Sequence, residues 1–186
     1  LSAKSGGTFS ADLQQKLSAM DGIAAVNPIL SRALDLLPDQ IDKDPQIPDR
    51  ITTLVLQGTD PELSQGMHSF PIQEGRFLQS GDTTSVVISQ NLAESGHFVL
   101  GGAFPLTTVH GLIDFTIVGI QPNLPAMGGE MVYLPLTEAE RALGLEGQLN
   151  VLEANYTEAA LKDRAAMDAK VLAMAGEGFK LGALTS

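Results

Sequence analysis

Three histidines are the side chains of this chain best suited to acid–base or metal chemistry, and they lie in three separate segments. They are His68, His97 and His110. A catalytic or metal site needs partners that converge on such a group, and no motif around these residues supplies them. The sequence therefore predicts structural or solvent-exposed histidines. A hydrolytic site stays open as an alternative only if the fold brings one histidine to a carboxylate or a nucleophile.

Other residues with chemical potential also lack the spacing that a site needs. A proline-interrupted window, residues 33–50, holds Asp35, Asp39, Asp42, Asp44 and Asp49. Calcium loops need alternating oxygen ligands, a glycine at the turn and a closing glutamate, and this window has no such order, so no metal site is predicted. The chain has no cysteine, which excludes disulfides and cysteine-based zinc sites. Walker A, G-x-S-x-G and H-E-x-x-H motifs are also missing, so neither a cofactor nor a catalytic residue is predicted.

The charge balance excludes one large class of partner. Asp and Glu number 22 against 11 Lys and Arg, which gives a formal net charge of −11. Between Arg50 and Arg141 the only basic residue is Arg76. Nucleic-acid binding needs clustered Lys and Arg to neutralise phosphates, so we expect no nucleic-acid partner. No stretch approaches the roughly 18–20 apolar residues of a membrane span. Because the chain begins at Leu1 and lacks a leader pattern, we interpret it as a piece of a longer protein.

Apolar periodicity predicts helix-on-sheet pieces at both ends of the chain. A helix within residues 10–21 is followed by a strand over 23–30. Near the other end, a strand over 149–156, a long helix capped by Thr157 and a strand over 179–184 predict a βαβ unit with a right-handed crossover. The apolar face of that long helix is expected to comprise Leu161, Ala165, Ala169 and Leu172.

The middle of the chain reads as a lobe of short strands. Short runs rich in β-branched residues predict strands over 51–56, 85–89, 104–109, 113–120 and 131–135. Residues 58–61 (Gly-Thr-Asp-Pro) indicate a turn, and short helices are expected at 90–94 and 137–143. The second of these helices would open with a capping box formed by Thr137 and Glu140. The fold class is therefore α+β, with a β-rich lobe inserted between two helix-on-sheet ends.

One loop is a candidate contact surface. Leu124, Pro125 and Met127 lie in a segment without periodicity, and methionine adapts to irregular partners. The alternative is that this segment packs against the β-rich lobe, and the sequence leaves both readings open.

Six segments in a fixed order carry a family resemblance. They are Gln57-Gly58-Thr59-Asp60-Pro61, Gln73-Glu74-Gly75-Arg76-Phe77-Leu78, Gly81-Asp82, Val86-Val87-Ile88-Ser89-Gln90-Asn91-Leu92-Ala93, Asp114-Phe115-Thr116-Ile117-Val118-Gly119-Ile120 and Val132-Tyr133-Leu134-Pro135-Leu136. The series resembles the MacB-type periplasmic core domain, the large extracytoplasmic domain of FtsX-like ABC transporter permeases. It covers essentially residues 10–184, with Gly101-Gly102 as a departure where the family usually has a Gly-Asp pair.

The resemblance implies an architecture. Such domains combine a porter-like α/β subdomain, built from both chain ends, with an inserted smaller β-rich subdomain. On this sequence the porter-like part would comprise residues 1–75 and 148–186, and the inserted part residues 76–147. The domain would lie between two membrane helices of the permease, so the chain ends should lie close together.

The resemblance also implies a function without catalysis. Members of this type convert nucleotide-driven movement in the cytoplasm into movement outside the membrane, which needs packed rigid lobes with a hinge between them. The expected partners are the flanking membrane helices, a separate cytoplasmic ATP-binding subunit and an extracytoplasmic protein or substrate, in a dimeric full-length permease. The alternatives are a freestanding extracytoplasmic hydrolase and a solute-binding module with a deep pocket between the lobes.

Overall fold

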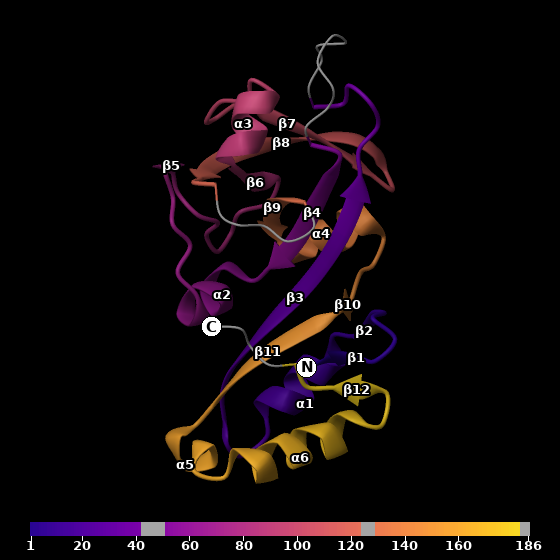
Figure 1. The fold of residues 1–186 in the computed structure, drawn as a ribbon, viewed down its shortest axis with the longest axis vertical. Coiled ribbons are helices and arrows are strands. Elements are labelled where there is room, and N and C mark those ends of the chain that lie inside the picture. Colours follow the sequence, from indigo (N-terminus) through magenta and orange to yellow (C-terminus); the bar gives the residue numbers. More distant parts are fainter. Residues whose placement is uncertain (42–50, 124–128, 183–186) are drawn as a thin grey trace.

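The structure is a computed structural model that describes residues 1–41, 51–123 and 129–182. It is elongated, with the short strands of the chain ends, β1 and β12, in one half and the β7–β8 hairpin in the other (Figure 1). The candidate contact residues Leu124, Pro125 and Met127 lie outside the described residues.

Eight strands of the described chain form one mixed sheet, in the order β11–β3–β4–β9–β6–β8–β5, with β7 also paired to β8. Neighbours are antiparallel except for the pairs β4–β9 and β6–β8, which are parallel. Each strand predicted between residues 23 and 156 is present. The bounds are β3 Ile23–Asp35, β4 Thr53–Thr59, β5 Glu74–Gly75, β6 Ser85–Ser89, β7 Ala103–Thr108, β8 Gly111–Gln121, β9 Glu130–Pro135 and β11 Val151–Tyr156.

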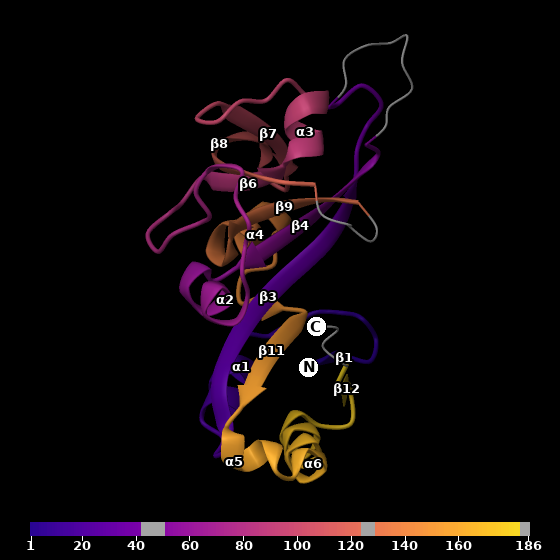
Figure 2. The ribbon, with the colours of Figure 1, turned by 60° about the vertical axis from the view of Figure 1, so that its left-hand side comes forward.

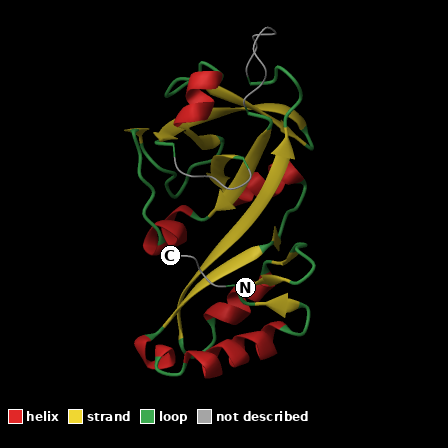
Figure 3. Ribbon diagram, in the orientation of Figure 1, coloured by secondary structure: helices red, strands yellow, loops and turns green. Residues whose placement is uncertain are grey.

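Helices and four short strands complete the described elements (Figure 3). The helices are α1 Asp12–Ser18, α2 Pro61–Met67, α3 Gln90–Ser95, α4 Leu136–Leu143, α5 Glu158–Leu161 and α6 Arg164–Ala175. The short strands are β1 Ser2–Ala3, β2 Phe9–Ser10, β10 Gln148–Leu149 and β12 Phe179–Lys180. β1 pairs with β12, and β2 pairs with β10.

Strand β3 runs from one half of the molecule to the other (Figure 1). Its 13 residues would span about 43 Å if fully extended. From Ile23 to Ile29 it pairs with β11, and from Ile29 to Asp35 it pairs with β4 on its other edge. The strand therefore changes partner at Ile29, near its middle, and is the continuous element between the two halves.

Two main hydrophobic cores lie at the two ends of β3. The lower core joins α1, α6 and the sheet through Leu13, Leu17, Val26, Leu149, Leu152, Met167 and Val171. The upper core is larger and includes Leu54, Leu56, Val86, Ile88, Leu92, Phe104, Phe115, Ile117, Val132 and Leu134. A third, smaller cluster surrounds Phe77, Leu78 and Val87, with the rings of Phe70 and Phe77 stacked at a centroid distance of 4.0 Å.

The segment predicted as a turn at residues 58–61 instead joins a strand to a helix: Gly58 and Thr59 end β4, and Asp60 and Pro61 start α2. Asp60 is the N-cap of α2, and its Oδ1 atom accepts hydrogen bonds from the backbone amides of Glu62 and Leu63, each at 3.0 Å. Pro61 occupies the first helical position, where its missing N–H costs nothing. The turn prediction was wrong because a seven-residue helix with Ser and Gly inside it carries almost no periodic signal.

The long C-terminal helix is in fact two helices. Thr157 caps α5 as predicted, but α5 ends at Leu161 and Asp163 caps α6 by accepting from the Ala166 amide at 3.1 Å. The break rotates the second helix, so Met167 and Val171 face the lower core. The predicted apolar face was therefore wrong: Leu161 is 54% exposed, and Ala165 and Ala169 are also exposed.

The predicted capping box at Thr137 and Glu140 is also wrong. Helix α4 begins at Leu136 with Pro135 as its N-cap, and no side chain caps it. A Glu140 oxygen instead accepts from the Gly147 amide at 3.3 Å, beyond the far end of the helix. The pattern misled because helix α4 starts one residue before the capping threonine, so Thr137 lies within the first turn.

The expected βαβ unit has a third strand between its two strands. Leu1 and Leu152 exchange both backbone hydrogen bonds, at 2.7 and 2.9 Å, while Ser2 lies opposite Lys180 in the antiparallel β1–β12 pair. β11 and β12 therefore run parallel with the first residues of the chain between them. The described ends of the chain are neighbours, as expected.

Candidate functional site

The polar side chains around the middle of β3 form the candidate site. We call Asn27, Ser31, His68, Asn150 and Glu153 the junction cluster, because they come from β3, from the end of α2 and from the start of β11. Backbone pairing of β3 changes partner within this cluster.

Asn150 replaces a strand partner at the point where β11 stops pairing with β3. Its Oδ1 atom accepts from the Ser31 amide at 2.9 Å, and its Nδ2 atom donates to the Ser31 carbonyl at 2.6 Å. The Asn150 amide itself donates to the Ile29 carbonyl at 3.1 Å. One side chain thus satisfies both peptide groups that the ladder would leave unpaired there.

His68 ties α2 to β11. Its Nε2 atom lies 2.7 Å from Glu153 Oε2, and the same carboxylate oxygen accepts from Asn27 Nδ2 at 2.9 Å. Asn27 and Glu153 are directly opposite one another on β3 and β11. The Asn27 side chain is buried, and its Oδ1 atom has no hydrogen-bond partner among the residues that the structure describes. The contact joins segments 85 residues apart.

The contact between His68 and Glu153 bears on whether a histidine takes part in a hydrolytic site. All three histidines are exposed, and His68 reaches a carboxylate. Among the described residues, the hydrogen bonds of His68 include none to a hydroxyl that could act as a nucleophile. The nearby Ser64 hydroxyl donates to the Asp60 carbonyl at 2.6 Å inside α2. The arrangement is suited to holding two segments together rather than to nucleophilic catalysis.

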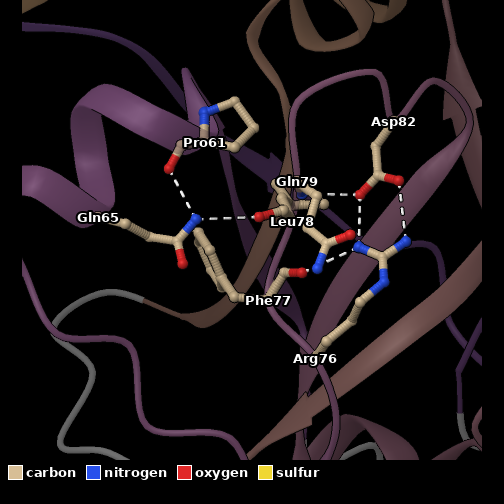
Figure 4. A network of polar contacts seen from close by, with 7 residues as sticks. All are labelled: Pro61, Gln65, Arg76, Phe77, Leu78, Gln79 and Asp82. Atoms are coloured by element: carbon tan, nitrogen blue, oxygen red, sulfur yellow. Dashed lines mark hydrogen bonds and ion pairs between the residues drawn. The ribbon is translucent and has the colours of Figure 1, made fainter.

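A second network holds the loop after β5 (Figure 4). Arg76 binds Asp82 through two parallel bonds, Nη1 to Oδ2 at 2.7 Å and Nη2 to Oδ1 at 2.9 Å. Asp82 also accepts from the Gln79 amide at 2.9 Å. The Arg76 guanidinium holds the pKa of the Asp82 carboxyl below its ordinary value, chiefly through these hydrogen bonds. Gln65 on α2 donates to the Leu78 carbonyl at 3.1 Å, so the loop is anchored to α2.

A third polar group lies at the start of α3. Ser89 caps this helix by accepting from the Leu92 amide, and its hydroxyl donates to Glu130 Oε2 at 2.6 Å. Asn91 Nδ2 donates to the other oxygen of Glu130 at 2.9 Å. The segments of the sequence that carry the family resemblance therefore build strands of the sheet, the N-caps of α2 and α3 and the anchor of the loop after β5.

A groove of about 670 Å³ lies beside the lower core. Its walls include β11, the N-terminal half of α6 and residues at both chain ends. Tyr156 donates to Asp168 Oδ1 at 2.6 Å, and Arg164 Nε lies 3.7 Å from Asp168 Oδ2. Burial, followed by this carboxylate, raises the pKa of Tyr156 to about 12. Sequence reasoning missed the groove because it placed Leu161 and its helical neighbours against the core.

Comparison with known proteins decides the family. A profile described as the MacB-like periplasmic core domain matches residues 2–174, almost the whole chain. The chain belongs to this family. As a MacB-like periplasmic core domain it is the extracytoplasmic domain of an ABC transporter permease. Among its described residues, no helix combines the length and apolarity needed to span a bilayer.

Solved structures share the fold of this MacB-like domain at low sequence identity. The extracellular domain of the noncanonic ABC-type transporter YknZ from Gram-positive bacteria matches with a TM-score of 0.59 and 15% identity, covering 83% of this chain and 77% of that one. The periplasmic region of MacB from Actinobacillus actinomycetemcomitans matches with a TM-score of 0.61 and 13% identity, covering 92% and 77%. A search of curated proteins found no significant match.

Proposed function

We propose that this domain transmits movement between the membrane part of its permease and a partner or substrate outside the membrane, without catalysing a reaction itself. The observation that carries the proposal is strand β3, which reaches from the lower core beside the chain ends to the upper core. A force applied at the chain ends would be carried along β3, through its covalent backbone and its hydrogen bonds, to the far half. Such a path transmits displacement only if its middle does not bend.

The junction cluster supplies that stiffness. Asn150 clamps both peptide groups of Ser31, and the His68–Glu153 contact holds α2 against β11 on the other side of the change of partner. We propose that these contacts hold β3 in one arrangement where it changes partner. We further propose that the lobes correspond to residues 1–75 with 148–186 and to residues 76–147.

The surrounding assembly is part of the same proposal. Membrane helices would precede and follow the domain, a cytoplasmic ATP-binding subunit would drive them, and the full-length permease would be a dimer. Adjacent chain ends support two attachment points on one side of the domain. A protein or substrate would bind outside the membrane.

The test is the ratio of transport to ATP hydrolysis in the full-length permease. Asn150→Ala removes the clamp on Ser31 and should lower this ratio several-fold while basal ATP hydrolysis is retained. Asn155→Ala, at an exposed position of β11, the strand that follows Asn150, is the matched control and should leave the ratio unchanged. Equal ratios for Asn150→Ala and wild type, with both proteins folded, would contradict the proposal. A hydrolase would instead lose a measurable hydrolytic activity on His68→Ala.

A further inference from the structure

We call the part of the groove beside the lower core that lies between β11 and the residues after β12 the slot. One wall is β11 from Val151 to Tyr156, and the opposite wall includes Leu181 and Gly182, which follow β12. Leu1 and Ser2 also line it. Figure 2 shows β11 on one side and the β1–β12 pair on the other. The first residues of the chain already lie between these two walls.

The backbone pairing of β1 places the start of the chain in this slot. Leu1 is paired with Leu152, and the pairing is antiparallel. Ser2 is paired with Lys180 on the opposite side. Alternate residues of a strand present their peptide groups to alternate neighbours, so β1 is the central strand of a β11–β1–β12 arrangement. A strand that continued backwards from Leu1 would run along β11 toward Tyr156.

Among the described residues, the outer edge of β11 is open along this path. β11 pairs with β3 on its inner edge over its whole length. On its outer edge, the backbone bonds found in the described part of the chain are those between Leu152 and Leu1. The peptide groups of Ala154 point the same way as those of Leu152, two residues earlier. Within the described part of the chain, the N–H and C=O of Ala154 therefore have no backbone partner on this edge.

We propose that the polypeptide preceding Leu1 in the permease continues β1 as a strand along the outer edge of β11. The inference rests on the proposed function, in which a membrane helix precedes this domain. The residue directly before Leu1 lies opposite Glu153. The residue two positions before Leu1 lies opposite Ala154 and exchanges both backbone hydrogen bonds with it. The side chain of this second residue is on the same face as Leu152 and packs toward the lower core, so an aliphatic residue fits there.

This strand is the mechanical attachment of the domain. A membrane helix joined to it pulls on β11 through a hydrogen-bonded ladder, rather than through a single flexible linker residue. Because β11 pairs with β3, the load passes directly to the strand that links the two cores. Tyr156, held by Asp168, stands at the end of the slot that the incoming chain meets first.

The experiment is a register-specific cross-link in the full-length permease. Cysteines replace Ala154 and the residue two positions before Leu1, in a 186-residue domain that has no cysteine of its own. Mild oxidation should join them within one chain, because directly opposite residues have the spacing a disulfide needs. The matched control moves the second cysteine to the residue directly before Leu1, whose side chain points to the other face, and that pair should stay reduced.

Hydrogen exchange gives an independent reading if a cysteine variant folds poorly. The Ala154 amide should exchange about ten-fold more slowly in a longer chain that carries the native residues before Leu1 than in a chain that begins at Leu1. Equal cross-linking of the two registers, equal exchange rates, or a disulfide between two copies through Ala154 would overturn the inference. Correct cross-linking with an unchanged coupling ratio in Asn150→Ala would keep the strand and reject the proposed function.

Discussion

The contribution of the bidentate pair between Arg76 and Asp82 to the free energy of unfolding can be estimated from its contacts. Asp82→Asn keeps the size of the side chain and replaces a carboxylate that accepts three hydrogen bonds, two from Arg76 and one from the Gln79 amide. Charge-assisted bonds each contribute about 1.5–3 kcal/mol when sheltered from water. The Arg76 side chain is 39% exposed, so solvent screening places the total near the lower end, at about 2 kcal/mol.

The assay is urea denaturation of the domain, followed by circular dichroism. Asp82→Asn should lower the free energy of unfolding by about 2 kcal/mol, which corresponds to a fall in Tm of about 4–8 °C for a chain of this size. Asp114→Asn, at an exposed position on β8, is the control and should change stability by less than about 0.5 kcal/mol. An Asp82→Asn variant as stable as the control would refute the assignment of this pair as a loop anchor.

The same pair predicts the direction of a pH effect. Because folding lowers the pKa of Asp82 below its ordinary value of 3.8, ionised Asp82 stabilises the folded state at neutral pH. That contribution is complete above the ordinary pKa and is lost as the pH falls through the lower, folded-state value. The stability difference between wild type and Asp82→Asn should therefore be constant from pH 7 to about 5 and shrink below about pH 4. A difference that grew on acidification would contradict the reasoning.

Three further predictions concern the packing and hydrogen bonding of single residues. Met167→Ala should lower the free energy of unfolding by about 3 kcal/mol, whereas Leu161→Ala should cost less than about 0.5 kcal/mol, because only Met167 is buried; chemical denaturation measures both. Asp168→Asn should move the pKa of Tyr156 from about 12 toward 10 without reaching it, since burial is the larger cause and remains; ultraviolet titration against Tyr156→Phe reads this out, and an unmoved value would exclude the hydrogen bond. Gly119→Ala should cost about 2 kcal/mol, because its Cβ would overlap the Arg76 carbonyl oxygen, while Gly66→Ala in α2 has open space around it and should be neutral or stabilising; a thermal melt that ranked them the other way would contradict the packing.

Much of the sheet could be predicted from the sequence because its signals are local. The runs around Val86 and Phe115 alternate or cluster β-branched and aromatic residues, and these strands are where the pattern placed them. The ordered segments that carry the family resemblance are equally local. They encode caps and turns such as Ser89 at the start of α3 and Arg76 beside Asp82. The sequence alone does not show whether these residues stabilise the fold or take part in function, because that depends on the contacts they make.

What could not be predicted depends on long-range contacts or on one-residue phase shifts. The break at Lys162 and Asp163 rotates α6 and replaces Ala165 by Met167 as a core residue. The junction cluster joins Asn27, His68 and Glu153, which are far apart in the sequence and carry no shared motif. The pairing of β1 between β11 and β12 needs only two residues, too few for any periodic signal. Leu124, Pro125 and Met127 stay a prediction, since they lie outside the described residues.

Whether the junction is fixed can be measured as a distance within the domain of the full-length permease. Spin labels at Lys170 on α6 and His110 in the β7–β8 turn, both exposed, would report the separation of the two halves. A fixed junction predicts one narrow distance distribution that stays unchanged between nucleotide-free and ATP-bound permease, and a broad one in Asn150→Ala. A wild-type distribution as broad as that of Asn150→Ala, or one that shifts with nucleotide, would contradict a domain that transmits movement through a fixed junction.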